Sequence, residues 1–374
     1  MTHTVPPPRN NGEFLTKNIW PWLEHYFHVL FHSRAAFPAY KPGHSGIFPI
    51  ADACSIALAA DWGTGTIPAY KVVSEIMKTE PDVTIHLGDV YYSGTPQEYN
   101  DWFLGREDWP HGAVSTWALN ANHEMYSGGH GYFETALPKL EQETSYFCLE
   151  NDHWRILGLD SGYYSGVFPL LEKLWRGKIR LHDVILEWLK TTVFADAHDT
   201  RPVILLTHHQ PFSAFDPGYP TLLKNVQPYL DRTVLWFWGH EHRFAGYGPV
   251  AYAGGRIVRG RCIGHGGMPI EQTAKPKDVR TPNLVFYDDR VDAGMTQLAG
   301  VPVGYCGFAS LALDGPVLTV RYIDQEGVLL FTEKWDCSSG KAVGSIAPGD
   351  GQLNVVHPAG LDALVAAQPA PVTV

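Results

Sequence analysis

Short apolar runs alternate with amphipathic stretches through the first two thirds of the chain. The apolar run at residues 56–60 and the largely apolar run at 83–87, which also contains Thr84 and His86, predict buried strands. Between them, residues 67–79 carry Val72, Val73, Ile76 and Met77 at helical spacing, which predicts an amphipathic helix. The same patterns predict a second helix at 181–194 and further strands at 117–121, 145–149, 154–159, 203–207 and 234–238. This order is typical of βαβ units around a largely parallel sheet.

Beyond residue 243 the apolar pattern changes to a period of two. It predicts the strands of a second sheet at residues 256–263, 307–313, 317–322 and 329–334. The segments Leu-Asp-Gly-Pro and Asp-Gln-Glu-Gly separate the last three of these strands and are typical of turns. Residues 271–304 show no clear period, so we expect a loop there that lines a pocket.

The two ends of the chain differ from its middle. Residues 1–12 are expected to be disordered, and residues 14–31 are expected to form an apolar helix that packs on its own domain. Docking of that helix on a membrane surface or a partner subunit is the alternative. From residue 337 the composition turns to Gly, Ala, Pro and Ser, which indicates an extended or mobile tail. We therefore divide the chain into an N-terminal extension (1–50), a main domain (51–336) and a tail (337–374).

Composition excludes several classes of protein. With 374 residues, 45% hydrophobic and 18% charged, the chain has the content of a folded protein with a large core. Its net charge of −11 argues against binding to a nucleic-acid polymer. The five cysteines are scattered, which favours neither a disulfide framework nor a structural zinc. We expect no transmembrane segment and no signal peptide, hence a cytoplasmic protein. The oligomeric state is not indicated.

Polar residues with metal-binding side chains follow the predicted strands. They form five clusters in a fixed order: Asp61-Trp62-Gly63, Gly88-Asp89-Val90-Tyr91-Tyr92, Asn122-His123-Glu124, His208-His209 and Gly239-His240-Glu241-His242. Strand ends that deliver such side chains to one rim are the layout of a metal site. This set of carboxylate, amide and imidazole groups exceeds what one ion needs, which favours two ions.

The order and spacing of these clusters resemble those of the calcineurin-like metallophosphoesterases, and most closely the purple acid phosphatases. The resemblance spans about residues 56–243. Most of that superfamily begins with Asp-x-His, but Gly63 stands where the His would be. Purple acid phosphatases share this loss and use a Tyr three residues after the second Asp, which is the position of Tyr92 after Asp89. The resemblance implies a four-layer α/β/β/α sandwich of two mixed sheets.

The resemblance also implies a role for each matched side chain. The first metal would be bound by Asp61, Tyr92 and His242. The second metal would be bound by Asn122, His208 and His240, and Asp89 would bridge the two. His209 is an alternative to His208, because His209-Gln210-Pro211 matches a His-x-Pro pattern of some purple acid phosphatases. A tyrosine ligand favours Fe(III) at the first site, and the second site suits Zn, Mn or Fe(II).

The function that follows is hydrolysis of a small phosphorylated substrate, most closely as a phosphomonoesterase of the purple acid phosphatase type. His123 lies directly after Asn122, so we expect it to act as the acid that meets the phosphoryl group, with Glu124 orienting it. A phosphodiesterase acting on nucleotide or phospholipid diesters would use the same ligands. Its pocket walls would differ, and the candidate walls are the loops at residues 161–176, 212–219 and 245–255. A non-catalytic metal-binding module is the third hypothesis.

Overall fold

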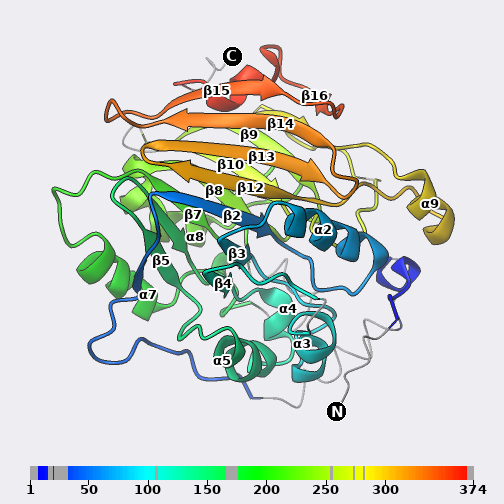
Figure 1. Ribbon diagram of the computed structural model, residues 1–374, viewed down its shortest axis with the longest axis horizontal. Coiled ribbons are helices and arrows are strands. Elements are labelled where there is room, and N and C mark those ends of the chain that lie inside the picture. Colours follow the sequence, from blue (N-terminus) through cyan, green and yellow to red (C-terminus); the bar gives the residue numbers. More distant parts are fainter. Residues whose placement is uncertain are drawn as a thin grey trace.

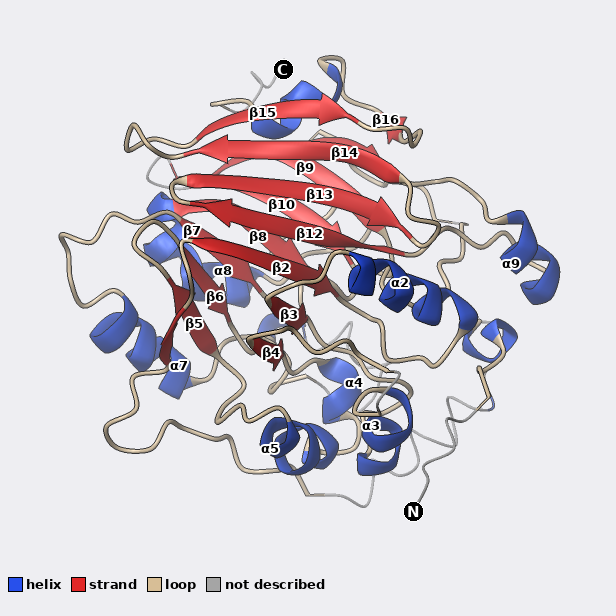
Figure 2. Cartoon of the chain, viewed as in Figure 1, coloured by secondary structure: helices blue, strands red, loops and turns tan. Residues whose placement is uncertain are grey.

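The structure, a computed structural model, describes residues 7–15, 20, 33–105, 108–165, 176–252, 256–272, 274–280 and 283–368. Two mixed sheets stack face to face, and helices lie outside them (Figure 1; Figure 2). This confirms the predicted α/β sandwich of two mixed sheets. The helix predicted over residues 14–31 lies outside the described residues, apart from residues 14, 15 and 20.

The seven-stranded sheet joins a parallel half to an antiparallel half. Its parallel half contains β2 (Ala53–Ala59), β3 (Val83–His86) and β4 (Ser115–Ala118). The antiparallel half begins beside β2 and runs in order through β12 (Gly307–Asp314), β13 (Val317–Asp324), β14 (Leu329–Asp336) and β15 (Val343–Pro348). The chain therefore returns to the seven-stranded sheet after forming most of the nine-stranded sheet.

The nine-stranded sheet has a parallel centre made of β6 (Arg155–Gly158), β7 (Val203–Leu206), β8 (Thr233–Trp238) and β10 (Arg256–Ile263). On one side of this centre lie β5 (Phe147–Glu150) and β1 (Ile47–Pro49). On the other side lie β9 (Phe244–Tyr252), β11 (Leu284–Tyr287) and β16 (Asn354–Val355). The sequence prediction grouped β10 with β12 to β14, but β10 pairs with β8 and β9 instead.

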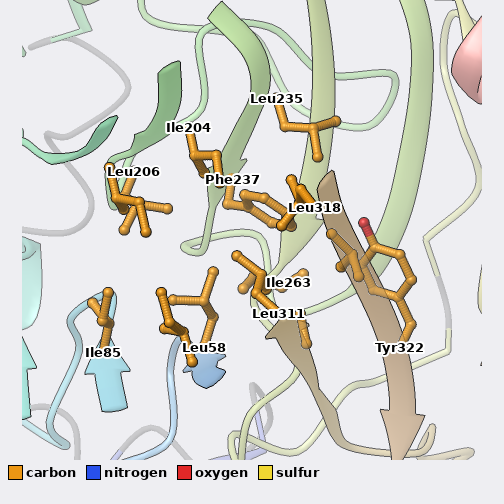
Figure 3. Packing of buried hydrophobic residues seen from close by; sticks show 14 of the residues in the cluster. Leu58, Ile85, Ile204, Leu206, Leu235, Phe237, Ile263, Leu311, Leu318 and Tyr322 are labelled. Carbon is orange, nitrogen blue, oxygen red and sulfur yellow. The ribbon is translucent and has the colours of Figure 1, made fainter. Parts of the chain in front are cut away.

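Apolar side chains fill the space between the two sheets. Leu58 and Ile85 come from the seven-stranded sheet, and Leu206 and Phe237 come from the nine-stranded sheet (Figure 3). All four are fully buried in one cluster. Burial of this kind supplies most of the favourable free energy of folding, so the inter-sheet core fixes how the two sheet edges face each other.

Helices cover the outer face of each sheet and complete the sandwich. On the seven-stranded sheet, α2 (Ile67–Lys78) buries Val72 and Ile76 against Ala57 and Phe308. It starts after Thr66 with Pro68 in its first turn, where the missing N–H of proline costs nothing. On the nine-stranded sheet, α7 (Asp183–Trp188), η4 (Leu189–Val193) and α8 (Pro220–Val226) contribute to a third apolar cluster. The predicted helices at 67–79 and 181–194 are confirmed, the second with a π-helical end.

Shorter helices occupy the connections. They are η1 (Asn11–Phe14), α3 (Pro96–Trp102), α4 (Asn122–Met125), η2 (Gly131–Ala136), α5 (Leu137–Lys139), η3 (Arg176–Lys178), η5 (Gln227–Arg232), α9 (Ala293–Ala299) and η6 (Gly360–Val365). Among the described residues, no helix is both long enough and apolar enough to cross a membrane.

Two predicted loops contain regular structure. Residues 245–255, predicted as a pocket wall, largely form β9, and residues 271–304 contain β11 and α9. The first six residues of β9 are all buried, so the strand lacks the alternation that marks a half-exposed strand. Gly246, Gly248 and Pro249 within it also carry the composition of a loop. Local pattern therefore could not separate this strand from a turn-rich segment.

The C-terminal residues also belong to the sandwich. β15 extends the seven-stranded sheet, β16 extends the nine-stranded sheet, and η6 buries Ala363 and Leu364 in the inter-sheet core. The composition of residues 337–374 predicted an extended or mobile tail, but most of this stretch is ordered across the open end of the two sheets. The division of the chain at residues 50 and 336 stays a prediction.

A buried ion pair connects the two sheets. Arg261 of β10 donates to Glu333 of β14 at 2.5 and 3.0 Å, and neither side chain is exposed. Glu333 also accepts hydrogen bonds from the Tyr322 hydroxyl at 2.9 Å and the Trp335 indole at 2.9 Å. Removal of one partner from such a pair leaves a buried charge without compensation, which is far more costly than loss of a surface pair.

We therefore expect Glu333→Ala to lower the free energy of unfolding by about 3–5 kcal/mol, because Arg261 would stay buried without its carboxylate. The control is Glu326→Ala, which breaks the exposed pair with Lys71 and should cost at most about 1 kcal/mol. Urea unfolding followed by circular dichroism measures both. Equal losses in the two variants would contradict the role of this ion pair.

Candidate metal centre

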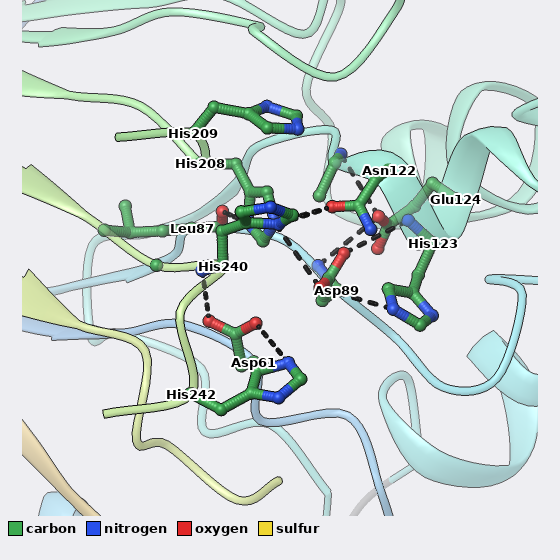
Figure 4. Close-up of polar contacts among 12 residues, drawn as sticks. Asp61, Leu87, Asp89, Asn122, His123, Glu124, His208, His209, His240 and His242 are labelled. Atoms are coloured by element: carbon green, nitrogen blue, oxygen red, sulfur yellow. Dashed lines mark hydrogen bonds and ion pairs between the residues drawn. The ribbon is translucent and has the colours of Figure 1, made fainter. Parts of the chain in front are cut away.

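Loops that follow five strands bring polar side chains together. The strands β2, β3 and β4 belong to one sheet, and β7 and β8 belong to the other. Parallel strands place their carboxyl ends at a common edge, and here the edges of both sheets meet. The side chains that gather there are shown in Figure 4 and are, in chain order, Asp61, Asp89, Asn122, His208, His240 and His242.

One group of these side chains surrounds the side-chain oxygen of Asn122. His208 Nε2 and His240 Nδ1 each lie 3.0 Å from Asn122 Oδ1. His208 Nε2 also lies 3.4 Å from Asp89 Oδ2. The amide nitrogen of Asn122 donates to the Tyr126 hydroxyl at 3.0 Å, which turns the amide oxygen toward the imidazoles. An amide oxygen, a carboxylate and two imidazole nitrogens therefore converge.

A second group shares Asp89 with the first. The Tyr91 hydroxyl oxygen lies 3.0 Å from Asp61 Oδ1, 3.2 Å from Asp89 Oδ2 and 2.8 Å from His242 Nε2. A hydroxyl carries one hydrogen, so it cannot donate fully to both carboxylates at the same time. Asp61 and Asp89 are both fully buried. The two buried carboxylates therefore share one hydroxyl hydrogen.

Tyr92, the predicted tyrosine ligand, points elsewhere. Its hydroxyl lies 3.3 Å from the carbonyl oxygen of Glu13. Its ring stacks on Phe14 with the centroids 4.9 Å apart, and the Arg9 guanidinium lies 4.6 Å from its centroid. Tyr91 thus takes the place in the cluster that the motif spacing assigned to Tyr92. Which of the two tyrosines would bind a metal ion stays a prediction.

Gly63 makes room for the loop that carries Tyr91. A Cβ atom at residue 63 would lie 2.9 Å from Val90 Cα, closer than real Cβ atoms approach other heavy atoms. The backbone N–H of Tyr91 donates to the Gly63 carbonyl at 2.9 Å. A histidine at this position, as in the Asp-x-His motif, would require the loop of Val90 and Tyr91 to move.

The N-terminal segment packs against the same loop. Arg9 donates to the Tyr91 carbonyl at 3.1 Å, and Phe14 is almost fully buried in a cluster with Tyr91, Tyr92 and Met268. Residues 1–12 were predicted to be disordered, but Arg9 and Phe14 lie in contact with the loop that carries Tyr91. The composition of this segment is typical of a disordered end, and only its tertiary contacts order it.

His123 faces the cluster in a fixed ring orientation. Its Nδ1 lies 2.6 Å from the Tyr92 carbonyl oxygen, so Nδ1 carries a hydrogen and Nε2 is directed inward. Nε2 lies 3.8 Å from Asp89 Oδ2, and the backbone N–H of His123 donates to Asp89 Oδ1 at 3.2 Å. This imidazole therefore stands beside the carboxylate that the two groups share.

Glu124 was predicted to orient His123, but its carboxylate holds the backbone of the neighbouring loops instead. It accepts from the N–H groups of Val90 at 2.9 Å, Ala121 at 3.1 Å and Asp89 at 3.3 Å. The Tyr99 hydroxyl adds a bond at 3.0 Å. Glu124 points away from His123 because its carboxylate caps the first turn of α4, and the Tyr92 carbonyl orients the imidazole in its place.

Of the two adjacent histidines, the structure brings His208 into the cluster. His209 turns to Ser161, whose hydroxyl oxygen lies 3.1 Å from His209 Nδ1 and accepts from the His209 backbone N–H at 3.0 Å. The ring of His209 stays near the site, with its centroid 4.8 Å from that of His240. It therefore borders the cluster without joining the converging ligand atoms.

Charge in the cluster is balanced by imidazole groups. Burial alone would raise the pKa of Asp89, but His123 and His208 beside it outweigh burial and hold that pKa well below its ordinary range. Burial alone would lower the pKa of His208, but the Asp89 carboxylate outweighs burial and raises it. For Tyr91, burial and then the carboxylates of Asp61 and Asp89 raise the pKa well above its ordinary value. A bound cation would offset the negative charge of these carboxylates. It would therefore lower the pKa values of His208 and Tyr91.

The residues present fit two metal ions. Among the described residues, potential ligand atoms lie within 4.8 Å of one another in Asp89, His208 and His240, and again in Asp61, Asp89 and His242. Carboxylate, amide and imidazole donors suit divalent transition metals. His240 and His242 are partly exposed, so the cluster is open to solvent on one side. Sequence reasoning missed Tyr91 and Tyr126, because both read as packing residues in an aromatic-rich chain.

Comparison with known proteins identifies the domain. The family model of the calcineurin-like phosphoesterases matches residues 54–244, which are 191 of the 374 residues. Comparison with curated proteins finds no significant match. Among solved structures, the chain is similar to GAP50, the anchor in the inner membrane complex of Plasmodium, with 12% identity, a TM-score of 0.48, and 82% of this chain and 90% of that chain covered.

It is also similar to a conserved protein of Streptococcus pneumoniae described as a predicted phosphoesterase. That match has 9% identity and a TM-score of 0.28, and it covers 80% of this chain and 99% of the other. The family match is of a different kind, because it spans more than half of the chain and runs from β2 past the last of the clustered histidines. The chain belongs to the calcineurin-like phosphoesterase family.

Proposed function

We propose that the chain is a dinuclear-metal hydrolase of phosphate esters, and specifically a phosphomonoesterase of the purple acid phosphatase type. The observation that carries this proposal is that two groups of potential ligand atoms share one carboxylate, Asp89. A shared carboxylate is what a pair of cations a few ångströms apart needs to offset their repulsion. The family match supports metal-dependent chemistry on a phosphate ester.

The proposed first site consists of Asp61, Tyr91 and His242, and the proposed second site consists of Asn122, His208 and His240, with Asp89 between them. Tyr91 replaces Tyr92 in this assignment because its hydroxyl lies nearer than 3.3 Å to three other ligand atoms. A tyrosine ligand needs a strongly acidic metal to be held as phenolate, which favours Fe(III) at the first site, and the donors of the second site suit Zn, Mn or Fe(II). When bound, the ions would supply Lewis-acid charge and an activated water to a phosphate ester.

The residues of the chain itself provide orientation and a proton. His123 Nδ1–H is committed to the Tyr92 carbonyl, so Nε2 is the atom available to a substrate. In its protonated form, His123 can donate from Nε2 to a phosphoryl oxygen or to the leaving oxygen. Glu124 keeps the Asp89 backbone and the start of α4 together, which fixes the distance between Asp89 and His123. Glu124 thus acts by positioning rather than by contact with substrate.

The test of the proposed function is hydrolysis of aryl phosphate monoesters and diesters by protein loaded with Mn²⁺, Zn²⁺ or iron. We expect monoester hydrolysis that is lost after chelation and restored by added metal. Asp89→Asn should abolish activity and leave fewer than two ions bound, because the bridge loses its charge. The exposed variant Asp336→Asn is the control. Preference for diesters would favour the phosphodiesterase alternative, and two bound ions without any hydrolysis would favour a non-catalytic module.

His123→Ala should keep both metal ions and lower kcat by about 10²–10⁴-fold, since it removes a proton donor without removing a ligand. Metal analysis by mass spectrometry and steady-state kinetics measure the two effects separately. His44→Ala, at an exposed histidine paired with Glu143, is the matched control and should change neither. Loss of an ion from the His123→Ala protein would show that His123 is a ligand.

Tyr91→Phe and Tyr92→Phe form a matched pair that tests which tyrosine binds the first metal. Tyr91→Phe should weaken binding at that site by about 10–100-fold or more, because a charged oxygen ligand is lost. Tyr92→Phe should bind both ions as the unmodified protein does. If the first ion is Fe(III), a visible charge-transfer band should disappear in Tyr91→Phe only. Disappearance in Tyr92→Phe only would restore the assignment made from motif spacing.

A further inference from the structure

The imidazoles around Asn122 are held on both of their nitrogens. For His208, Nε2 faces Asn122 Oδ1, and Nδ1 lies 2.9 Å from the Leu87 carbonyl oxygen. A carbonyl oxygen only accepts, so this contact requires a hydrogen on Nδ1. With a metal ion bound between Nε2 and Asn122 Oδ1, Nε2 would carry no hydrogen and would be the ligand atom. Such outer contacts fix the tautomer and the ring orientation of a metal-binding histidine. In His208 the main chain of the loop before Asp89 supplies that contact.

For His240 the corresponding contact comes from a side chain. His240 Nδ1 lies 3.0 Å from Asn122 Oδ1, and its Nε2 lies 3.0 Å from the hydroxyl oxygen of Tyr219. His240 sits in a loop with a left-handed φ of 68°, and its side chain is only partly buried. Its ring is therefore less constrained by packing than that of fully buried His208. A hydrogen bond to the outer nitrogen should then contribute more to the ring orientation of His240.

Tyr219 itself is held rigidly. It is 3% exposed, and its backbone N–H donates to the Gln210 carbonyl at 3.1 Å. It directly precedes α8, whose first turn begins with Pro220. Its ring packs among the apolar residues of the nine-stranded sheet's outer face and meets the ring of His209 edge-on at 4.8 Å. A hydroxyl on so fixed a ring is a precise anchor for a neighbouring imidazole.

We propose that Tyr219 is a positioning residue for the second metal: its hydroxyl oxygen accepts a hydrogen bond from His240 Nε2–H and so aims Nδ1 at the ion. This inference rests on the proposed dinuclear centre and names a part of it that no ligand motif contains. A hydroxyl oxygen that accepts a hydrogen bond keeps its own hydrogen, so acceptance from the imidazole does not change the protonation of Tyr219. The hydroxyl of Tyr219 is therefore expected to increase the affinity of the second site for its metal ion and to leave the affinity of the first site unchanged.

The experiment measures metal binding without substrate, so it does not depend on which ester the protein hydrolyses. Metal-free protein is titrated with Mn²⁺ by isothermal calorimetry, for the unmodified chain and for Tyr219→Phe. We expect one of two binding steps to weaken by about 10–100-fold in the variant, and the other to stay within about twofold. Tyr229→Phe is the control, because Tyr229 is a half-buried tyrosine on η5 that stacks on Phe194.

Kinetics with an aryl phosphate add a second readout. In Tyr219→Phe, activity should need more Mn²⁺ for half-activation, while kcat and KM at saturating Mn²⁺ should return to within about twofold of the unmodified protein. Unchanged affinity for both ions would overturn the proposal. A raised KM with unchanged metal affinity would also overturn it and would indicate that Tyr219 contacts substrate. Absence of any hydrolysis in the unmodified protein would refute the proposed function, while the calorimetric result would still decide the role of Tyr219.

Tyr219→Phe removes one oxygen atom and keeps the ring that packs beneath α8, so the fold is expected to persist. Circular dichroism of the metal-free variant checks this directly. A second variant, Tyr219→Leu, removes the ring as well. It should weaken the same binding step at least as much as Tyr219→Phe. Weakening in Tyr219→Leu alone would show that the ring, and not the hydroxyl, supports the site, which would contradict the proposed hydrogen bond.

Discussion

The structure depends on how two buried carboxylates, Asp61 and Asp89, are kept next to each other. Both lie at the ends of neighbouring parallel strands, and both are fully buried. Two carboxylates in such proximity repel each other and are costly to bury unless positive charge lies between or beside them. The surrounding groups reduce this repulsion. Histidines arrive from the other sheet, and a tyrosine hydroxyl lies between the two acids. The inter-sheet core is what brings these two sets of loops together.

The same loops carry backbone conformations that most side chains avoid. Left-handed φ values occur at Asp61 (57°), Asp89 (73°), His240 (68°) and His242 (35°). Asp and His tolerate this region better than most residues, but the conformation still has to be stabilised by its surroundings. Here the stabilising contacts are specific. The His240 N–H donates to Asp61 Oδ2 at 2.9 Å, and Glu124 accepts the Asp89 N–H. The cluster is thus organised by its main chain as well as by its side chains.

Much of this arrangement could be predicted from the sequence alone. Once the parallel strands are predicted correctly, the residues that follow them are expected to meet at a common edge of the sheet. The runs before Asp61, Asp89 and Asn122 are short and mostly apolar, and the structure places strands there. The pattern could not show which of Tyr91 and Tyr92 turns inward, since neighbouring residues of an irregular loop have no fixed alternation. Glu124 was misread for a related reason. Its role lies in hydrogen bonds to main-chain groups far away in the sequence, and those leave no trace in the composition.

The pairing of sheets was also beyond local pattern. Strands β12 to β14 read as a separate sheet, although they extend the sheet begun by β2, because sequence periodicity identifies strands but not their neighbours. β15 and η6 were missed where the residues are small and turn-forming. Their order comes from contact with β14 and with the apolar core between the sheets. The tertiary contacts of these C-terminal residues therefore determine which segments belong to the two sheets and their core.

The tight approach of Val90 to Gly63 has a consequence for how such a centre can change. A histidine at residue 63 and an inward tyrosine at residue 91 compete for the same space, because the first would displace the loop that presents the second. The two ways of completing the proposed first site are thus mutually exclusive packings rather than independent substitutions. A chain that passed from one to the other through single replacements would cross a form with an incomplete site. A change from a tyrosine ligand to a histidine ligand would need a coordinated change in the loops of Gly63 and Tyr91. The choice of ligand therefore depends on both loops together.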